Sequence, residues 1–255
     1  MISKDELLRY DRHIKLSAIG LEGQEKLKSA KVLVVGVGGL GCPVLQYLTS
    51  SGVGAIGVMD VDVVSLNNLQ RQVLFTTDDI GRLKTTTAIK RLKKSNPLVE
   101  LNNLAFYLTK ENALEIIKDY DVIVDCTDNF PSRYLINDAC VLLGKPFVYG
   151  ALHKFNGQLS VFNYNDGPTY RCLYPDIPKQ DEVPNCSQAG VLGVLPSLIG
   201  TLQATEVIKI ILGIGEVLSG KILTYDLLSN RQGVICFPKS EILVKELSDY
   251  NLKCD

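Results

Sequence analysis

KVLVVGVGGLG (residues 31–41) joins a short apolar run to a glycine-rich turn, and this junction predicts the architecture of the chain. The run KVLVVG (31–36) is rich in Val and continuously apolar, which is typical of a parallel strand buried on both faces. The turn GVGGLG (36–41) opens a segment that we expect to be helical as far as about Ser50. The core is therefore expected to start with a strand, a tight turn and a helix.

Strands and helices are predicted to alternate as far as residue 155. Further short apolar runs predict strands at 55–60, 98–105, 121–128 and 146–152. Between them we expect a helix with a basic face at 81–96 and further helices at about 110–118 and at 131–143. Such an alternation favours right-handed crossovers, so we expect an α/β, Rossmann-like, mostly parallel sheet with helices on both faces.

The pattern changes after residue 155, where we expect an antiparallel extension. GQLSVFNY (157–164) alternates like an antiparallel strand, and 221–237 reads as two strands joined by a turn at Ser229–Asn230. Between them lie a Pro-, Asp- and Asn-rich segment at 165–188 and a long apolar helix at 189–212. Long segments without periodicity are usually functional or mobile, so 165–188 is predicted to be a flexible crossover.

The whole chain, 1–255, is predicted to form one domain, because it shows neither an internal repeat nor an interdomain linker. Two short amphipathic helices are expected within 3–29. A nucleotide-binding half is expected at 30–155 and a second half at 156–255.

Composition and charge point to a soluble protein with a localised site. Lys plus Arg number 27 against 28 for Asp plus Glu, so no basic field is present to hold nucleic acid or an anionic membrane. No stretch reaches the roughly 18 apolar residues that a membrane span requires, and the N-terminus lacks the apolar core of a signal peptide. The seven cysteines are scattered, which predicts reduced thiols and a cytoplasmic location.

The glycine turn predicts a nucleotide site. Gly36, Gly38, Gly39 and Gly41 permit a tight turn and let backbone N–H groups approach a phosphate at the positive end of the helix. Asp60 ends the next strand, where a carboxylate can accept hydrogen bonds from a ribose.

A nicotinamide-dependent oxidoreductase is one alternative for such a motif. It would need an acid–base group at the substrate carbon. The chain contains no Tyr-x-x-x-Lys pair, His13 lies upstream of the fold, and His153 is the one plausible proton relay. The alternative stays open but is disfavoured.

Polar residues after Asp60 suit a triphosphate with a metal ion. DVDVVSLNNLQRQ (60–72) supplies most of them, and Lys84 follows in GRLK: Asp62, Asn67, Asn68, Arg71, Gln72 and Lys84. Arg71 and Lys84 can neutralise phosphate charge, although a solvated polar loop and a basic helix face would look similar. Asp128, followed by Asn129, ends the 121–128 strand and is a candidate ligand for magnesium.

Several segments together resemble the ThiF/MoeB/HesA family, which is related to the ubiquitin-activating enzymes. They are RYDRHIKL (9–16), GVGGLG (36–41), DVDVVSLNNLQRQ (60–72), GRLK (81–84), DCTDN (125–129), TYRCLYP (169–175) and NCSQAGVLG (185–193). The likeness runs from about residue 5 to about residue 237.

The resemblance implies ATP-dependent adenylation of the C-terminal Gly-Gly of a ubiquitin-like sulfur carrier protein, of the ThiS or MoaD type. Pyrophosphate is released, and the acyl-adenylate is ready for sulfur transfer in thiamin or molybdopterin biosynthesis. The sequence does not distinguish these pathways, and residues 156–255 become the carrier-binding half.

Residue roles follow from the same resemblance. Gly39 would back the phosphates, Asp60 would bind the ribose, and Asp128 would act through Mg²⁺. Asn68, Arg71 and Lys84 would contact the triphosphate. Family members are homodimers, and Arg12 would reach the nucleotide of the partner subunit. Cys186 matches a cysteine that some relatives use in a covalent linkage to the carrier, whereas others adenylate without it.

The chain departs from the family at its zinc site. Relatives commonly hold a structural zinc with two CxxC pairs, but here the first pair reads Thr169-Tyr-Arg-Cys172. Cys236 and Cys254 form no second pair, so we predict that structural zinc is absent. A sulfurtransferase domain of the kind some relatives carry does not fit after residue 237, which makes a separate sulfurtransferase a possible partner. A catalytically inactive nucleotide-binding scaffold is the other alternative, although Arg71, Lys84 and Asp128 are all present.

Overall fold

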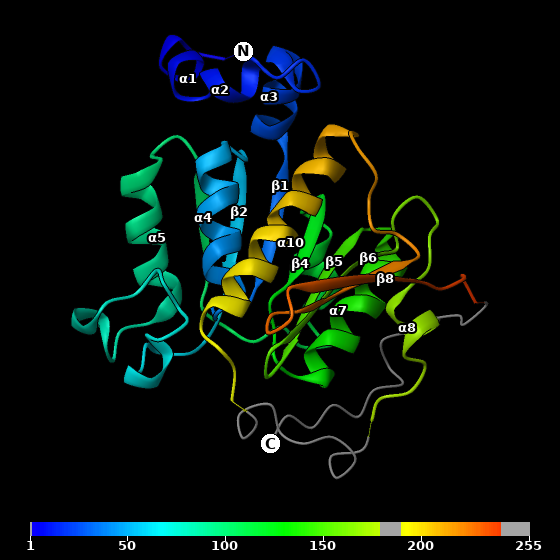
Figure 1. The fold of residues 1–255 in the computed structure, drawn as a ribbon. Coiled ribbons are helices and arrows are strands. Elements are labelled where there is room, and N and C mark those ends of the chain that lie inside the picture. The colour runs from blue at the N-terminus through cyan, green and yellow to red at the C-terminus, as the bar shows by residue number, and fades with distance from the viewer. Residues whose placement is uncertain (1, 179–189, 241–255) are drawn as a thin grey trace.

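The computed structural model describes residues 2–178 and 190–240, and in this part of the chain the strands form a single eight-stranded sheet (Figure 1). Its order is β3-β2-β1-β4-β5-β6-β7-β8. The strands are β1 Lys31–Val35, β2 Ala55–Met59, β3 Glu100–Leu104, β4 Val122–Asp125, β5 Phe147–His153, β6 Asn156–Phe162, β7 Lys221–Asp226 and β8 Arg231–Cys236. Strands β1 to β5 are parallel, whereas β6, β7 and β8 pair in antiparallel fashion. The predicted fold class is confirmed.

Helices cover both faces of the parallel part of the sheet, and a group of helical segments, α1 to α3, precedes β1. The helices of the described residues are α1 Lys4–Arg9, α2 Asp11–Ile14, α3 Gly20–Ser29, α4 Gly41–Ser51, α5 Lys84–Ser95, α6 Ala113–Ile117, α7 Phe130–Leu143, α8 Tyr170–Leu173 and α10 Val194–Leu212, with 3₁₀ turns η1 Leu66–Asn68 and η2 Thr77–Asp79. Helices α4, α5 and α10 pack on one face, and α6 and α7 pack on the other. Side chains of β1 alternate between the two cores, with Val32 and Val34 in one and Leu33 and Val35 in the other.

Helix α10 is apolar on all sides and is the central helix of its face. It packs against α4, β5 and β6. Gly200 lets α10 approach the start of α4 closely, because a Cβ on Gly200 would lie 2.5 Å from the Leu40 carbonyl oxygen. Contrary to the expectation from the sequence, α10 is long and apolar enough to cross a membrane, but helices that form the core of a domain pass the same test. Figure 1 shows it lying across the sheet.

The N-terminal region contains three helical segments, where the sequence predicted two. The chain turns at Tyr10, between α1 and α2, and Gly20 takes a φ of +60° as α3 begins. The Tyr10 hydroxyl accepts a hydrogen bond from Asn96 Nδ2 at 2.9 Å. This contact ties the N-terminal group to the C-terminal ends of α4 and α5, which is a long-range interaction that periodicity does not show.

Two further boundaries differ from prediction in the second half. The helix expected from residue 189 begins at Val194, because Gly190 has a φ of +69° and Val191 forms a β-bridge with Lys154. A short helix, α8, lies inside the segment predicted to be an irregular crossover, and Thr169 caps its start. A single helical turn leaves no periodic signal, so the sequence could not show it. The rest of the predicted crossover, 179–188, lies outside the described residues.

Candidate functional site

The candidate site lies where parallel strands end beside the glycine turn. Strand β1 sits between β2 and β4, so the segments that follow these three strands meet at one edge of the sheet. The order of the strands reverses here, which is where open α/β sheets bind ligands. In Figure 1 this edge faces downward, and helices α4, α5 and α10 all begin there. Helix N-termini carry partial positive charge, which favours an anionic ligand.

Three of the four predicted glycines are required by close packing. Gly36 has a φ of +100°, and a Cβ there would lie 2.6 Å from the Cys126 carbonyl oxygen. A Cβ on Gly41 would lie 2.0 Å from the Gly36 carbonyl oxygen. A Cβ on Gly39 would lie 2.8 Å from Cβ of Pro196, at the start of α10. The loop is therefore fixed by β4 and by α10, and the phosphate role of Gly39 stays a prediction.

Gly38 is the glycine of the turn with free space around its Cα. The side-chain amide of Gln72 lies beside it and has an oxygen without a hydrogen-bond partner among the described residues. The nearest atom to a Cβ on Gly38 is Gln72 Nε2, at 3.8 Å. Gln72 is 3% exposed, and its Oε1 has no hydrogen-bond partner among the described residues. A buried polar group without a partner is costly, so this amide is well suited to a ligand in the glycine turn.

Asp60 connects the end of β2 to the glycine turn. Its Oδ2 accepts a hydrogen bond from the Val37 amide at 2.7 Å, and its Oδ1 accepts one from the Asp62 amide at 2.8 Å. Each carboxylate oxygen can accept a second hydrogen bond. Asp60 can thus hold the turn and still accept from a ribose hydroxyl.

Lys84 and Asp62 form an ion pair at the start of α5. Lys84 Nζ donates to Asp62 Oδ2 at 2.8 Å, and the Lys84 side chain is 6% exposed against 62% for Asp62. The Lys84 amide also donates to the Asp62 carbonyl oxygen at 2.9 Å. The lysine is thereby held near the glycine turn, and Asp62 acts here as its partner.

The remaining polar residues of 60–72 are largely engaged in local structure. Asn68 Oδ1 accepts from the Ser65 amide at 3.2 Å and caps η1. Asn67 Oδ1 accepts from the Ser65 hydroxyl at 2.5 Å, and Arg71 Nη1 donates to the Asn67 carbonyl oxygen at 2.9 Å. The aliphatic stem of Arg71 lies near Gly39. These contacts fix the segment and leave further donors of Arg71 for a ligand.

Asp128 lies in the connection between β4 and α7, and its side chain is exposed. Asn129 caps α7, since its Oδ1 accepts from the Ser132 amide at 2.9 Å. Among residues 2–178 and 190–240 no cluster of three His, Cys, Asp or Glu side chains could hold a metal by itself. One carboxylate nevertheless fits Mg²⁺, which commonly binds through one or two carboxylates, phosphate oxygens and water.

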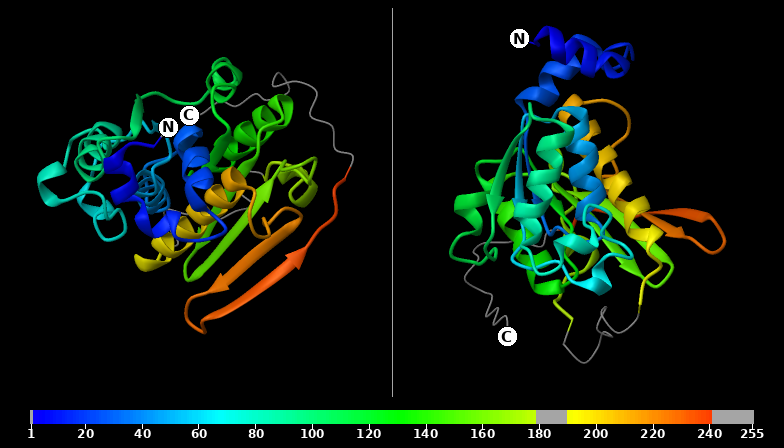
Figure 2. Two further views of the ribbon diagram at one scale, coloured as in Figure 1. Left: turned by 90° about the horizontal axis from the view of Figure 1, so that it is seen from above. Right: turned by 90° about the vertical axis from the view of Figure 1, so that its left-hand side faces the viewer.

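The structure places Arg12 far from this edge. Arg12 is exposed on α2, and the neighbouring Tyr10 contacts Asn96 and Gly52 at the C-terminal ends of α5 and α4. Both helices begin at the candidate site, and α4 alone is about 16 Å long. The right-hand view of Figure 2 shows the N-terminal helices beyond the opposite end of the sheet. Cys186 lies outside the described residues.

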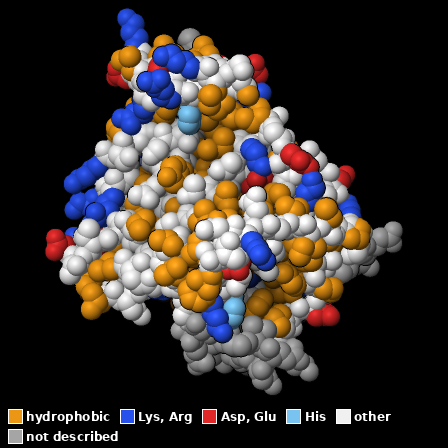
Figure 3. Space-filling view, in the orientation of Figure 1, with side chains coloured by type: hydrophobic (Ala, Val, Ile, Leu, Met, Phe, Trp, Pro, Cys, Tyr) orange, Lys and Arg blue, Asp and Glu red, His pale blue; other side chains and the backbone are white. Residues whose placement is uncertain are grey.

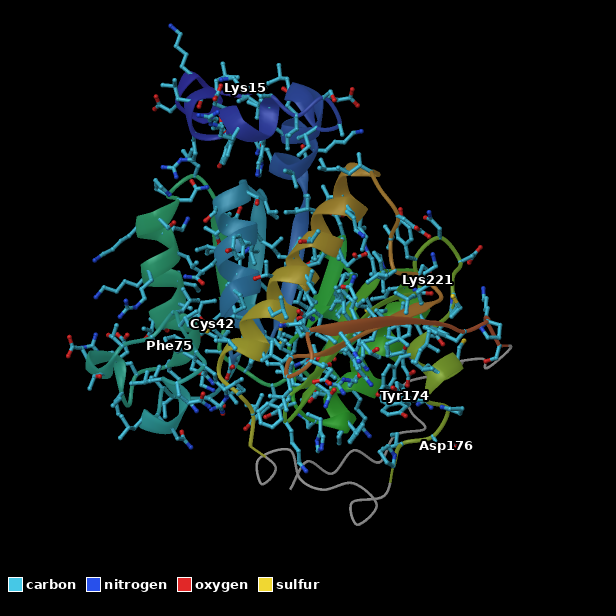
Figure 4. The ribbon with its side chains drawn as sticks, viewed as in Figure 1. Lys15, Cys42, Phe75, Tyr174, Asp176 and Lys221 are labelled. Carbon is cyan, nitrogen blue, oxygen red and sulfur yellow. The ribbon has the colours of Figure 1, made fainter. Side chains whose placement is uncertain are left out.

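Thiols near the site are buried and protonated. Burial raises the pKa of Cys42 to about 12 and raises the pKa of Cys126 well above its usual value. Figure 4 places Cys42 at the lower end of α4, with Phe75 nearby on the loop that follows η1. Neither thiol is suited to act as a nucleophile.

Sequence reasoning missed the buried polar groups beneath the site. Asp125, Arg133 and Gln203 form a hydrogen-bonded group beneath the connection between β4 and α7 (126–129), here called the Asp128 loop, although none of them was singled out. The available signals were Asp125 within DCTDN (125–129) and an Arg near the start of the helix expected at 131–143.

Comparison with known proteins gives one family and several close relatives. The ThiF family model matches residues 10–242. The chain is 49% identical to the sulfur carrier protein adenylyltransferase of Thermus thermophilus, over 99% of this chain and 98% of that protein. It is 48% identical to the adenylyltransferase and sulfurtransferase MOCS3 of Xenopus laevis over 90% of this chain, but spans only 51% of that protein.

A solved structure shares the fold. The crystal structure of E. coli MccB with ATP superimposes with a TM-score of 0.78 at 25% identity, over 92% of this chain and 73% of that chain.

Proposed function

The chain belongs to the ThiF family and is an adenylyltransferase, and from that premise we propose that it activates the C-terminal Gly-Gly carboxylate of a ThiS- or MoaD-type sulfur carrier. The observation that carries the proposal is the meeting of the glycine turn, Asp60, Lys84 and Asp128 at one edge of the sheet. The name of the Thermus relative, which matches nearly its whole length, supports a sulfur carrier as acceptor.

The reaction is a nucleotidyl transfer. A carboxylate oxygen of the carrier attacks the α-phosphorus of ATP, a new acyl–oxygen–phosphorus bond forms, and the bond to the bridging oxygen of the β-phosphate breaks. Pyrophosphate leaves with that electron pair, and the carrier becomes an acyl-adenylate. No side-chain nucleophile is required, which agrees with the buried thiols of Cys42 and Cys126.

The residues of this chain bind and orient the substrate. Lys84 and Arg71 place positive charge near the phosphates, where negative charge develops on the leaving pyrophosphate. Asp60 accepts from the ribose, and Gln72 supplies the spare buried acceptor beside Gly38. Asp128 would hold Mg²⁺, which when bound supplies charge neutralisation on the phosphates.

A homodimer would complete the site. Arg12 lies at the opposite end of α4 and α5 from its own glycine turn, so it can contribute only to another copy. We propose that Arg12 of the partner subunit reaches the nucleotide and that the protein acts in the cytoplasm. A separate sulfurtransferase would then deliver sulfur to the acyl-adenylate, and a covalent role of Cys186 and the absence of structural zinc stay predictions.

ATP–pyrophosphate exchange tests the proposal. Purified protein is mixed with ThiS-like and MoaD-like carriers from the same genome, each with and without its terminal Gly-Gly. We expect exchange with one carrier and loss of exchange when its tail is removed, which would also identify the thiamin or molybdopterin pathway.

Asp128→Ala should lower the exchange rate at least about 100-fold, as removal of a group that stabilises transition-state charge commonly does. Asp119→Ala, which changes an exposed carboxylate just before β4, is the matched control and should leave the rate unchanged. ATP binding without exchange on any carrier would favour the inactive scaffold. A change in NADH absorbance with candidate substrates would favour the oxidoreductase.

A further inference from the structure

The Asp128 loop is short, and both of its ends are held by one buried carboxylate. Asp125, the last residue of β4, is fully buried. Its Oδ1 accepts hydrogen bonds from the amide and the hydroxyl of Thr127, at 2.8 and 2.5 Å. Its Oδ2 accepts one from Arg133 Nε at 2.8 Å. Both oxygens are therefore used to shape the residues around Asp128.

Arg133 spans the loop from the helix side. It lies in the first turn of α7 and is 6% exposed. While its Nε pairs with Asp125, its Nη2 donates to the Thr127 carbonyl oxygen at 3.1 Å. Its guanidinium carbon lies 4.8 Å from the centre of the Tyr149 ring. One planar group thus holds the strand end, the residue before Asp128 and the start of the helix.

The floor of the loop is held from α10. Gln203 is fully buried, and its Nε2 donates to the Asp125 carbonyl oxygen at 2.7 Å. The Cys126 thiol lies 3.8 Å from Gln203 Oε1, within hydrogen-bond distance for sulfur. The backbone at the strand end therefore has little freedom to move, and Asp128 is carried by a loop that is fixed on three sides.

The electrostatics of the pair argue for a positional role. Burial acts to lower the pKa of Arg133, but attraction to Asp125 outweighs it and raises the pKa, so the guanidinium stays charged. A buried ion pair contributes little net stability compared with apolar residues of the same size. What it supplies here is geometry, because the planar fork of Arg can bond two directions at once and a Lys ammonium cannot reproduce it.

We propose that Arg133 is a positioning residue for Asp128, acting through Asp125 and the Thr127 carbonyl. The inference rests on the proposed role of Asp128 in adenylation. Arg133 itself does not touch the nucleotide; it holds the backbone on either side of Asp128 in place before substrate arrives.

A second buried pair on the same helix provides a matched control. In the middle of α7, Asp138 is fully buried, and its two oxygens accept from Arg171 Nε and Nη2 at 2.9 and 3.1 Å. This pair anchors α8 and the segment after it, where the Tyr134 hydroxyl also donates to the Asp176 carbonyl oxygen at 2.6 Å. Figure 4 places Asp176 beneath α8, on the segment that follows this helix. The Arg171 guanidinium also donates from Nη1 to the Pro175 carbonyl oxygen at 2.8 Å, within the same segment.

Amide hydrogen exchange on the free protein tests the inference without any substrate. In R133K, amides of residues 126–132 should exchange at least about tenfold faster, because the loop opens more often. In R171K, those amides should exchange at the wild-type rate, and faster exchange should appear at 170–176. Equal rates for 126–132 in wild type and R133K would overturn the inference, whatever the activity.

Kinetics of ATP–pyrophosphate exchange provide the second readout. R133K should lower kcat about 10- to 100-fold, since small misplacements of a reacting group have effects of that size, and should raise the Mg²⁺ concentration needed for half-maximal rate. The KM for ATP should change less than about twofold, because the glycine turn and Lys84 are untouched. An equal loss in R133K and R171K, or a rise in KM with kcat unchanged, would contradict positioning.

Thr127 variants keep the test available if R133K fails to fold. Thr127→Val removes only the hydroxyl bond to Asp125, and Thr127→Ser retains it. We expect Thr127→Val to speed amide hydrogen exchange at residues 126–132 and to lower kcat, and Thr127→Ser to behave as the wild type. Identical behaviour of the two variants would overturn the inference. A wild-type protein without pyrophosphate exchange on any carrier would contradict the proposed function, while the loop measurements would still decide whether Arg133 holds residues 126–132.

Discussion

The parallel part of the sheet and the β7–β8 hairpin are built under different constraints. In β1, four of the five residues are buried, whereas all six residues of β8 are exposed. Strand β1 has a neighbour on each side and helices on both faces, and β8 is an edge strand. The left-hand view of Figure 2 shows the hairpin projecting from the helical body. The addition of one methyl group should therefore change the free energy of unfolding by different amounts in the two regions.

Charge is distributed differently as well. Figure 3 shows Lys and Arg side chains gathered along the edge over α5, whose exposed residues include Lys90 and Lys94. At the candidate site two of the cations, Lys84 and Arg133, are instead buried. Exposed ion pairs contribute little to stability, whereas a buried cation is held in one geometry.

The largest expected effect is that of a methyl group added at Gly41. Its Cβ would lie 2.0 Å from the Gly36 carbonyl oxygen, a contact that requires the backbone to shift. We expect Gly41→Ala to lower the free energy of unfolding by about 3 kcal/mol or more, as overpacking against backbone does, and to abolish ATP binding. Urea denaturation and calorimetric titration with ATP measure the two effects.

Gly233→Ala is the control in the hairpin. A Cβ there would meet only the Thr224 side-chain oxygen, at 3.1 Å, and that side chain can rotate. We expect a change within about 1 kcal/mol and unchanged ATP affinity, because Ala loses less entropy than Gly in a strand. Similar destabilisation by the two variants would show that the hairpin is as constrained as the glycine turn.

A smaller effect, on ATP affinity alone, is expected when Lys84 is replaced. Lys221, which also forms an ion pair, provides the control. Lys84→Met should weaken ATP binding about 10- to 100-fold, which corresponds to loss of a charged hydrogen bond. Its fold should survive, since Asp62 is 62% exposed and stays hydrated without the lysine. Isothermal titration and thermal melting report affinity and stability separately.

Lys221→Met removes the equivalent charge from β7, where Lys221 pairs with Glu216 at the surface. Its ATP affinity should match that of the wild type within about twofold, because the pair lies in the antiparallel part. If both variants lost affinity equally, the effect would be one of net charge, and the proposed position of Lys84 at the phosphates would be wrong.

Sequence patterns predicted both regions well where the cause is local. The glycine turn, strands β1 and β2 and the turn near Asn230, which has a φ of +51°, follow from residues close together in the chain. The first residues of helices were predicted less accurately. The expected helix at 81–96 begins only at Lys84, after Gly81 with a φ of +83°, since propensity does not locate the first turn.

What the sequence could not show are contacts between distant residues. The packing of Pro196 on Gly39 and the support of Asp125 by Gln203 join segments that are far apart in the chain. Such contacts depend on how α10 lies against the sheet. The burial of a charged side chain such as that of Arg133 is not expected from its polarity. It is explained by the ion pair with Asp125, which cannot be read from the sequence.

The smallest expected effect concerns two thiols, one under the parallel part of the sheet and one in α8, whose sulfur contacts Ser240 after β8. Cys172, in α8, is half-buried; burial acts to raise its pKa, but hydrogen bonds from Ser240 and Thr169 outweigh this and hold the pKa below its usual value. A lower pKa means more thiolate at a given pH, so alkylation of Cys172 by iodoacetamide should reach half its maximal rate at a lower pH than in the urea-unfolded protein.

Cys42 provides the contrast, because burial raises its pKa to about 12 and it should not react while the protein is folded. Mass spectrometry of tryptic peptides after timed alkylation at pH 6 to 10 measures both thiols in one sample. Thr169→Val removes the hydroxyl near the Cys172 sulfur, at 3.5 Å, and should move the midpoint for Cys172 upward while leaving Cys42 unreactive. A midpoint for Cys172 equal to that of the unfolded chain would mean that the Ser240 and Thr169 contacts do not stabilise the thiolate.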